Sequence, residues 1–423
     1  MIISILFWVA VMILLARLFL SQDADLKPFF ATGLFVKILA GIGVGLVYTY
    51  YYSAGDTFGF FNDAQTLSSF LKKAPGEYFG FLIQGDRSYA LADELLNSER
   101  RSLFLVKNLS LISMLSFNNY WVASVAFSTV SFLGCWYAFR KITDQFPEGK
   151  WAAIISFLLV PSFVFWSSGI IKESLSIAAL MFLVGFIVQL LSGEKNKLWE
   201  WIVALTAVVF LWKLKYYWAA LFMPAAVTTI LLLRFIIPVI NSRNKVYEVL
   251  LWLIIFGFIV LGASNIHPNF YLSRFLNVVV ENHNAYVIAS VEGPVVNFYN
   301  LESTWGSILV NSPWALFSGL FRPFVLESGS VFQMVIALEN LLLLGLCLFN
   351  IQYITRAWHS NHRLLIISVG IYICLLAIFL TLSTPNFGTL SRYRVGFLPF
   401  FFFLLLYYPS QLLFEKINKL KIR

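Results

Sequence analysis

The stretch FFATGLFVKILAGIGVGLVYTYYYSAGDTFGFFNDAQ, residues 29–65, joins a long apolar run to a polar segment that begins at Gly55 and Asp56. The apolar part, residues 29–52, is long enough to cross the roughly 30 Å hydrocarbon core of a bilayer as a helix. Similar runs recur along the whole 423-residue chain, which is 60% hydrophobic and only 12% charged. Soluble domains carry about 25% charged residues, so the composition indicates a membrane protein.

The sequence predicts an all-α, polytopic membrane protein with about eleven transmembrane helices, because backbone polar groups in lipid have to be satisfied within each span. No soluble domain or internal repeat is evident, so residues 1–423 are interpreted as a single membrane domain. The predicted spans are residues 1–20, 29–52, 119–139, 151–171, 174–192, 199–214, 216–237, 247–264, 328–349, 364–383 and 395–412.

Basic residues predict the orientation of the chain. With these spans, most Lys and Arg residues fall in connections on one side, which the positive-inside rule identifies as cytoplasmic. The N-terminus is then outside and the C-terminus inside, in a bacterial cytoplasmic membrane. The net charge of +9 is attributed to these connections and to anionic lipid, so nucleic acid is not expected as a partner. The connections hold Arg17, Lys27, Arg140, Lys141, Lys150, Lys195, Lys197, Arg234, Arg243, Lys245, Arg356 and Arg363, and the tail adds Lys416, Lys419, Lys421 and Arg423.

Two long segments, residues 53–118 and 265–327, fall on the extracytoplasmic side in this topology. Apolar residues recur at helical spacing in 57–71, 90–116 and 306–324, so these ranges are expected to form amphipathic helices in the headgroup plane. Pro313 and Pro323 are expected to prevent the last of them from crossing the membrane. Loops on a rigid scaffold often carry binding and chemistry, so the functional site is expected on this face.

Asp56 is the first candidate for catalysis. It follows Gly55 and stands where the N-cap of a helix over 57–71 would stand, so a capping role is one interpretation. The other is a general base that takes a proton from an attacking hydroxyl. Asp63 lies seven residues on, hence on the same helix face, and is a candidate second acid.

Two further stretches place charges at the outer membrane edge. In PSFVFWSSGIIKES, residues 161–174, Lys172 and Glu173 begin a helix and form either an interfacial pair or a phosphate site. In TPNFGTLSRYRVGFLPF, residues 384–400, Arg392 and Arg394 flank Tyr393. Guanidinium groups fork onto phosphate oxygens, so phosphate binding competes here with contacts to lipid headgroups.

The remaining acids, cysteines and histidines give weaker indications of a functional site. Glu339 stands out as an acid deep in an apolar span, so it is expected to face the bundle interior or a cavity. The three cysteines and four histidines show no ligand spacing, so no metal site is predicted.

Three features together resemble the GT-C class of integral membrane glycosyltransferases. They are the Gly55-Asp56-Thr57 step, the stretch from Pro161 to Glu173, and RYRVGFLPF from Arg392 to Phe400. The resemblance implies an inverting transfer of a sugar from a polyprenyl-phosphate-linked donor, as in the biosynthesis of cell-envelope polysaccharides.

By this resemblance Asp56 is the catalytic base. The resemblance also implies that Lys172, Arg392 and Arg394 hold the phosphate of the donor. Glu173, Tyr393 and Asp63 are further expected substrate-binding residues beside them. Many members carry two adjacent acids where this chain has Asp56 and Thr57, so a requirement for a divalent cation stays open.

Bacterial polymerases of O-antigen and exopolysaccharide repeat units resemble the chain nearly as well, and they are the first alternative. A lipid or sugar transporter or flippase is the second alternative. Transporters usually show repeats and charges near the midplane of the membrane.

Overall fold

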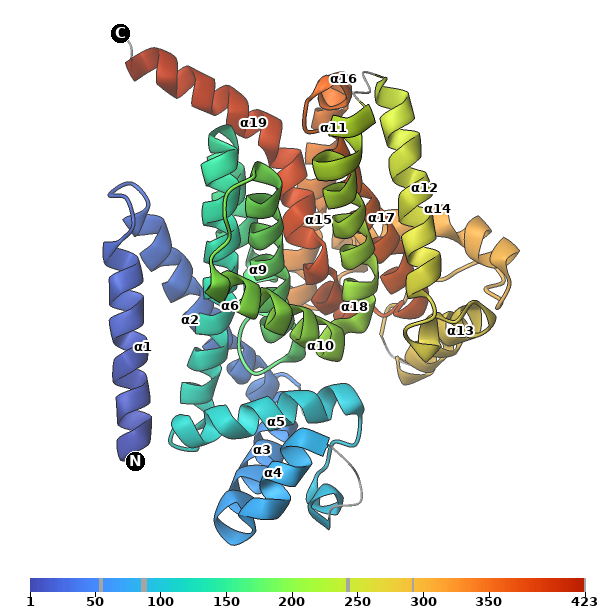
Figure 1. Cartoon of the computed structure of the whole chain (residues 1–423). Helices are drawn as coiled ribbons and strands as arrows, with labels where there is room; N and C mark the ends of the chain where they lie inside the picture. The colour runs from blue at the N-terminus through green and yellow to red at the C-terminus, as the bar shows by residue number, and fades with distance from the viewer. Residues whose placement is uncertain (53–55, 85–89, 241–243, 291–292, 422–423) are drawn as a thin grey trace. The chain divides into compact units, whose positions relative to one another are not determined.

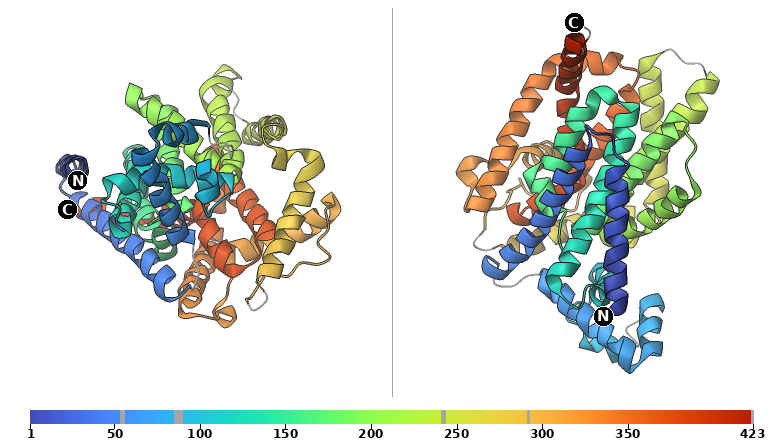
Figure 2. Two further views of the ribbon diagram at one scale, coloured as in Figure 1. Left: turned by 90° about the horizontal axis from the view of Figure 1, so that it is seen from below. Right: turned by 90° about the vertical axis from the view of Figure 1, so that its left-hand side faces the viewer.

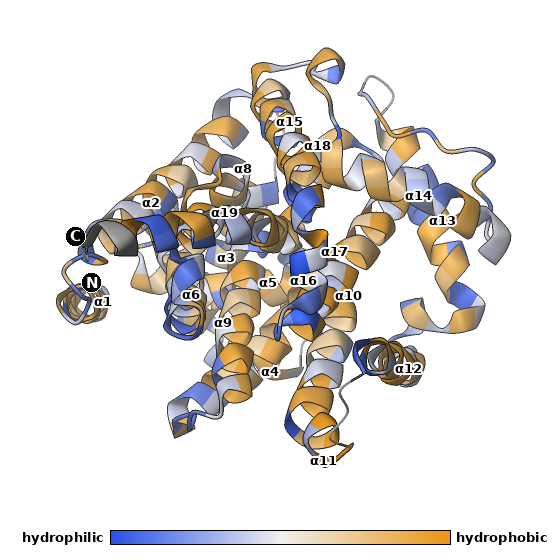
Figure 3. Cartoon of the chain, turned by 90° about the horizontal axis from the view of Figure 1, so that it is seen from above, coloured by the Kyte–Doolittle hydropathy of each residue, from blue (hydrophilic) through white to orange (hydrophobic). Residues whose placement is uncertain are grey.

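The computed structural model describes residues 1–52, 56–84, 90–240, 244–290 and 293–421, and it is shown in Figure 1. These residues form helices joined by turns, with one isolated β-bridge between Val295 and Asn386 among them. Nine helical stretches in the described ranges are long and apolar enough to cross a membrane. Figure 3 shows many apolar residues, in orange, on the helices of the chain. The prediction of an all-α protein with many membrane-spanning helices is thereby confirmed.

The chain divides into two compact units, which are described separately. Unit 1 comprises residues 1–139, 163–184 and 198–216. It contains α1 (Ile2–Leu20), α2 (Lys27–Tyr50), α3 (Asp56–Lys73), α4 (Pro75–Gln84), a 3₁₀ turn (Ala90–Glu94) and α5 (Arg100–Leu115), and it takes residues from α6 (Tyr120–Gln145), α8 (Pro161–Trp166), α9 (Lys172–Ser192) and α10 (Leu198–Leu231).

Unit 2 comprises residues 140–162, 185–197 and 217–423. Besides the remaining parts of α6, α8, α9 and α10, it contains α7 (Lys150–Ile154), α11 (Ile237–Ile240), α12 (Lys245–Ala263), α13 (Leu272–Ala289), α14 (Trp305–Phe321), α15 (Val331–Asn350), α16 (Ile354–His359), α17 (Arg363–Ser383), α18 (Phe387–Tyr393) and α19 (Leu398–Lys421). Within this unit α17 packs against both α13 and α14.

The segment after α2 folds into a packed helical layer in unit 1. Helix α3 contacts both α4 and α5, and Figure 2 shows the three helices together. Phe60, Phe61, Ala64 and Leu67 lie on one buried face of α3, which the spacing of the apolar residues predicted. The predicted helix over 57–71 is therefore confirmed as α3, with Lys72 and Lys73 in its last turn.

The expected helix over 90–116 begins later than predicted. Helix α5 begins at Arg100, and Leu96 before it is 77% exposed. The backbone N–H groups of Leu96 and Asn97 donate to the Asp63 carboxylate, so they are not used in a helix. In unit 2 the third predicted helix, over 306–324, is α14, which continues through Pro313 and ends at Phe321, before Pro323.

The predicted span over 151–171 is not one continuous helix. Helix α7 passes into a π-helical segment, Ile155–Leu159, and Pro161 then begins the short helix α8, which ends at Trp166. Proline has no N–H to donate and its ring clashes with a preceding turn, so the break at Val160 and Pro161 follows from the sequence.

The spans predicted over 199–214 and 216–237 lie in one 43-residue helical stretch, Leu198–Ile240. A straight helix of that length would measure about 65 Å, roughly twice the thickness of a bilayer core. The backbone at Lys215 is non-helical, with φ −140° and ψ 62°, so the stretch is broken at the residue between the two predicted spans.

Candidate functional site

Asp56 is the first residue of α3 and its side chain is exposed. Thr57 next to it is buried, and its Oγ1 lies 2.8 Å from the hydroxyl of Tyr120 on α6. The rings of Phe58 and Tyr120 are stacked with their centroids 4.3 Å apart. These contacts fix the first turn of α3, and Asp56 lies at the N-terminal end of that turn. A carboxylate at this position suits either an interaction with the helix N-terminus or a role in chemistry.

Lys172 lies close to this end of α3. Its Nζ is 5.3 Å from the centroid of the Phe60 ring. Phe60 follows Asp56 by four residues, and residues at that spacing are neighbours on one helix face. Unit 1 therefore brings a carboxylate and an ammonium group to the same face of α3, although their residues are more than 100 positions apart in sequence.

The turn that precedes Lys172 is held by buried polar groups. Lys37 of α2 donates to Ser131 Oγ at 3.0 Å and to the backbone oxygen of Ser167 at 3.1 Å, and it also donates to Ser167 Oγ. Gly169 has φ +75° and donates its N–H to Ser128 Oγ at 3.0 Å. A side chain at Gly169 would be strained at that φ, so the turn requires glycine.

Lys37 was not identified among the candidates, where the deep residue that stood out was the acid Glu339. The side chain of Lys37 is wholly buried in the middle of a candidate membrane span. The signal was present, because a charged residue within an apolar run always requires a partner. The partners, three oxygen atoms of Ser131 and Ser167, could not be foreseen from spacing.

Lys172 is paired with Glu99. The two groups are 2.9 Å apart, and Glu99 also pairs with Arg101. Burial acts to raise the pKa of Glu99, but the charges of Lys172 and Arg101 and their hydrogen bonds outweigh it and hold this pKa at about 2. Glu99 is therefore ionised at every physiological pH.

Glu173 points to a different partner. Its Oε1 lies 2.6 Å from Lys215 Nζ, and both side chains are almost fully buried. The expected interfacial pair of Lys172 and Glu173 is thus replaced by two separate pairs, Lys172 with Glu99 and Glu173 with Lys215. The second pair lies at Lys215, the point where the backbone of α10 is broken.

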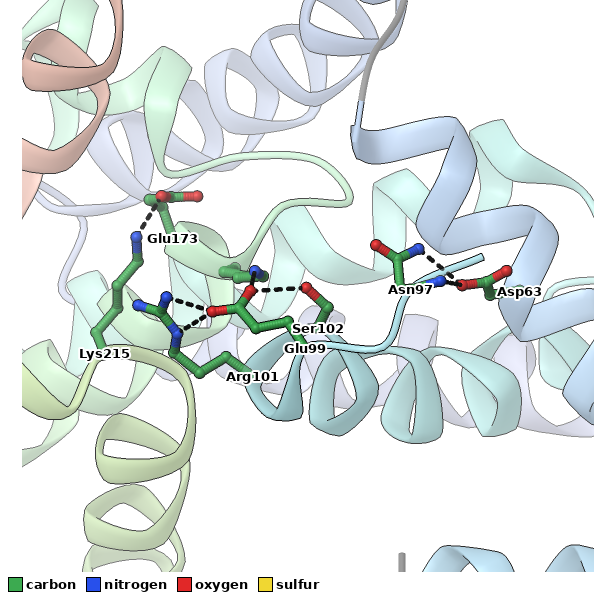
Figure 4. A network of polar contacts seen from close by, with 8 residues as sticks. Asp63, Asn97, Glu99, Arg101, Ser102, Glu173 and Lys215 are labelled. Carbon is green, nitrogen blue, oxygen red and sulfur yellow. Dashed lines mark hydrogen bonds and ion pairs between the residues drawn. The ribbon is translucent and has the colours of Figure 1, made fainter. Parts of the chain in front are cut away.

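Asp63 is 2% exposed and is used within the chain. Its carboxylate accepts hydrogen bonds from the backbone N–H groups of Leu96 and Asn97, both at 2.9 Å, and from Asn97 Nδ2 at 2.7 Å (Figure 4). This geometry favours an anchoring role for Asp63 over contact with a substrate.

In unit 2, the segment Arg392-Tyr393-Arg394 ends α18. Arg392 and Tyr393 are partly buried, whereas Arg394 is only 1% exposed. Arg394 Nη1 lies 3.4 Å from the backbone oxygen of Arg322, and burial lowers the pKa of Arg394 to about 10 against the opposing charge of Glu339. Arg394 is thus fixed beneath the surface, and Arg392 is the more accessible of the two cations.

Glu339 of α15 is the acid near Arg394. Its Oε1 accepts the backbone N–H of Ser162 at 2.8 Å, at the start of α8. The sequence placed Glu339 in the bundle interior, and the structure agrees, with 8% of the residue exposed.

A cavity of about 430 Å³ lies in unit 2, and its walls are almost wholly apolar. One wall residue, Tyr217, contacts Tyr393 with their ring centroids 6.3 Å apart. The cavity thus lies next to the segment that carries Arg392 and Arg394. Its walls come from α10, α12, α13, α14 and α17, and include Leu221, Val260, Phe275, Trp305, Ile308 and Phe379.

The candidate residues are divided between the units. Asp56, Asp63, Lys172 and Glu173 belong to unit 1, and Arg392, Tyr393 and Arg394 belong to unit 2. In the described parts of both units, no group of three or more His, Cys, Asp or Glu residues is arranged to hold a metal ion.

Comparisons with protein-family models, with curated proteins and with solved structures found no match to this chain. Its function is therefore inferred from the geometry of its own residues.

Proposed function

We propose that the chain is an integral membrane glycosyltransferase that acts at the outer face of a bacterial cytoplasmic membrane. It moves a sugar from a polyprenyl-phosphate-linked donor to an acceptor hydroxyl. The observation that carries this proposal is the apolar cavity beside Arg392-Tyr393-Arg394. An apolar cavity next to cations suits an amphiphile with a hydrocarbon chain and an anionic head, and a polyprenyl phosphate is such a molecule.

The topology proposed for this function has about eleven crossings, with the N-terminus outside. The broken stretches over 151–171 and 198–240 supply the crossings beyond the nine long apolar helices. The cavity walls agree with this set of crossings, which places the segments that line the cavity on one side. All the segments that line the cavity fall on the outer side in this topology. They are the C-terminal ends of α12 and α17, the start of the second half of α10, and helices α13 and α14.

In the proposed reaction Asp56 accepts the proton of the acceptor hydroxyl. The acceptor oxygen then forms a bond to the anomeric carbon while the bond from that carbon to the phosphate oxygen breaks, with inversion. The phosphate leaves with the electron pair. The candidates to stabilise the charge that develops on it are Lys172 in unit 1 and, in unit 2, Arg392 and Arg394.

The substitution Asp56→Asn tests the assignment, with Asp93→Asn at another exposed acid of the 53–118 segment as the control. Purified protein is mixed with radiolabelled donor and with membranes that supply the acceptor. Loss of a general base typically costs about 10²- to 10⁴-fold in rate. We expect such a loss for Asp56→Asn and wild-type transfer for Asp93→Asn. Wild-type transfer by Asp56→Asn removes Asp56 as the base.

A transporter is the second candidate, and the buried charges Lys37 and Glu339 are the observation that favours it. Charges deep in spans often mark transport pathways. Here both side chains are bonded to polar groups of the chain itself, which suits a structural role. Movement of labelled lipid-linked sugar between leaflets, without release of the sugar from its phosphate, would favour transport.

A further inference from the structure

The Glu99 carboxylate is held by side chains from two helices of unit 1. Oε2 lies 2.9 Å from Lys172 Nζ and accepts a hydrogen bond of 3.1 Å from Ser102 Oγ. Oε1 accepts from the guanidinium of Arg101 (Figure 4). Glu99 is the residue before α5, yet its side chain makes no capping hydrogen bond to that helix. The carboxylate is therefore bound as an anion by side chains and does not serve as a helix cap.

The surrounding backbone also favours an anion. Helix α5 has 16 residues and begins at Arg100, and α9 has 21 residues and begins at Lys172. The N-terminus of a helix carries a partial positive charge, and its first N–H groups have no acceptor within the helix. Glu99 stands immediately before the N-terminus of α5, and the side chain that reaches it from α9 is that of the first residue of that helix, Lys172.

Positive charge exceeds negative charge along the neighbouring faces of α5 and α10. Arg101 lies over the ring of Tyr216 at 5.6 Å, and the rings of Phe104 and Phe210 are 5.1 Å apart. Lys107 and Lys213 each follow one of these phenylalanines by three residues, and within the described part of the chain neither contacts an acid. The two acids of this region, Glu99 and Glu173, are therefore outnumbered by its basic residues. These are Arg101, Lys107, Lys172, Lys213 and Lys215.

The Glu99 site is accessible to a ligand. The side chain of Glu99 is 45% exposed, that of Arg101 is 35% exposed and that of Lys172 is 13% exposed. Exposed ion pairs are individually weak, so a ligand with more than one negative charge can replace the carboxylate. Since Asp63 anchors the backbone at Leu96 and Asn97, only the Glu99 side chain has to rotate.

We propose that Lys172, Arg101 and Ser102 form a phosphate-binding site in unit 1, and that Glu99 is the internal anion that phosphate displaces. Phosphate presents three acceptor oxygens, which match the ammonium group, the forked guanidinium and the hydroxyl at this position. The ligand class is a phosphate ester, either the headgroup of a lipid or a free phosphate compound. The inference deepens the role that the proposed function gives to Lys172.

Binding of inorganic phosphate to the purified full-length chain, measured by calorimetry, tests the site. Glu99→Gln removes the competing anion and keeps the shape of the side chain, so phosphate should bind about tenfold more tightly than to wild type. Glu94→Gln, an exposed acid in the same segment, is the matched control and should bind as wild type does. Adding Arg101→Gln or Lys172→Gln to Glu99→Gln should weaken binding again by about tenfold.

Nanodiscs of phosphatidylcholine, with or without a long-chain alkyl monophosphate, distinguish the two sources of phosphate. The lipid arm measures binding of the alkyl monophosphate in nanodiscs, and the soluble arm measures binding of inorganic phosphate. If Glu99→Gln binds more tightly in the lipid arm alone, the site is assigned to headgroups. If it binds more tightly in both arms, the site admits free phosphate as well. Equal affinity of Glu99→Gln and wild type in both arms overturns the proposal, as does binding that is unchanged by Arg101→Gln. Arg101 is partly exposed, so its replacement gives a folded protein even where Lys172→Gln does not.

These outcomes are separate from the proposed function. If the chain transfers sugar but Glu99→Gln binds phosphate no more tightly than wild type, only this phosphate site is refuted. A phosphate site that behaves as described, in a chain without transferase activity, would refute only the enzyme.

Discussion

Single residues of unit 1 differ in how far they are buried. Asp63 and Glu173 are buried and bonded to other parts of the chain, whereas Asp56 is exposed at the start of α3. Spacing placed Asp56 and Asp63 on one helix face, with Asp56 as the first candidate and Asp63 as a second acid. The difference between them depends on Leu96 and Asn97, which are distant in sequence and come close only in the folded chain.

Asp63→Ala should destabilise the layer of α3, α4 and α5. The N–H groups of Leu96 and Asn97, which are partly buried, would lose their acceptor. An unsatisfied donor costs about 1–3 kcal/mol where it is fully buried and less where water reaches it, so we expect a loss below about 3 kcal/mol. Hydrogen exchange should become faster at these two amides, while the spans of unit 2 exchange as before. Wild-type exchange at Leu96 and Asn97 would contradict the anchoring role.

Glu99 predicts a particular dependence of stability on pH. Its pKa is about 2 in the folded chain against an ordinary value of 4.5, so the unfolded chain binds its proton first as the pH falls. The stability contributed by Glu99 is complete above pH 4.5 and is lost as the pH falls towards 2. Because the group is partly exposed, we expect less than about 1 kcal/mol.

The difference in melting temperature between wild type and Glu99→Gln measures this contribution. It should be constant from about pH 6 to about pH 8 and should shrink at about pH 3. A difference that changes near neutral pH would mean that another group is responsible.

At the scale of helices, hydrophobic periodicity predicted most elements. It failed where polar contacts determine the residue at which a helix begins. The apolar face of α3 was predicted correctly because a helix that buries one face has apolar residues at helical spacing, whether that face contacts lipid or protein. The start of α5 was placed ten residues early, because Asp63 withdraws two amides from the helix. The break at Pro161 could have been predicted, since proline cannot continue the hydrogen bonding of a helix.

The pairings of the charged residues could not be predicted in the same way. Lys172 and Glu173 are adjacent in sequence, and the interpretation as an interfacial pair joined them to each other. Successive residues of a helix point in different directions, so each reaches a different element, Glu99 before α5 and Lys215 in α10. Such long-range pairs depend on tertiary packing.

The buried pair of Glu173 and Lys215 should stabilise the broken helix α10. Lys215→Met leaves the Glu173 carboxylate without its cation, which typically costs about 3–5 kcal/mol. Replacing both, Glu173→Leu with Lys215→Met, should cost less than Lys215→Met alone. Lys213→Met, two residues away and exposed, is the control and should change stability by less than about 0.5 kcal/mol.

Unfolding of the purified variants in detergent measures these differences. A double variant at least as unstable as Lys215→Met would show that the cost comes from lost packing, not from an unpaired charge.

At the scale of the whole molecule, the predicted topology can be tested with single cysteines. In a variant without Cys135, Cys347 and Cys374, a cysteine at exposed Glu302 should react with an impermeant maleimide in intact cells. A cysteine at exposed Asn361 should react only after the membrane is permeabilised. Equal labelling of both positions in intact cells would refute the proposed orientation.

The most direct test of the central claim is sugar transfer by the purified chain in liposomes that contain a radiolabelled polyprenyl-phosphate sugar. We predict that the label leaves the lipid for an acceptor when wild-type protein and acceptor membranes are present, and that Asp56→Asn leaves the label on the lipid. Label that stays on its phosphate with correctly inserted wild-type protein, or that leaves equally fast with Asp56→Asn, would contradict the claim.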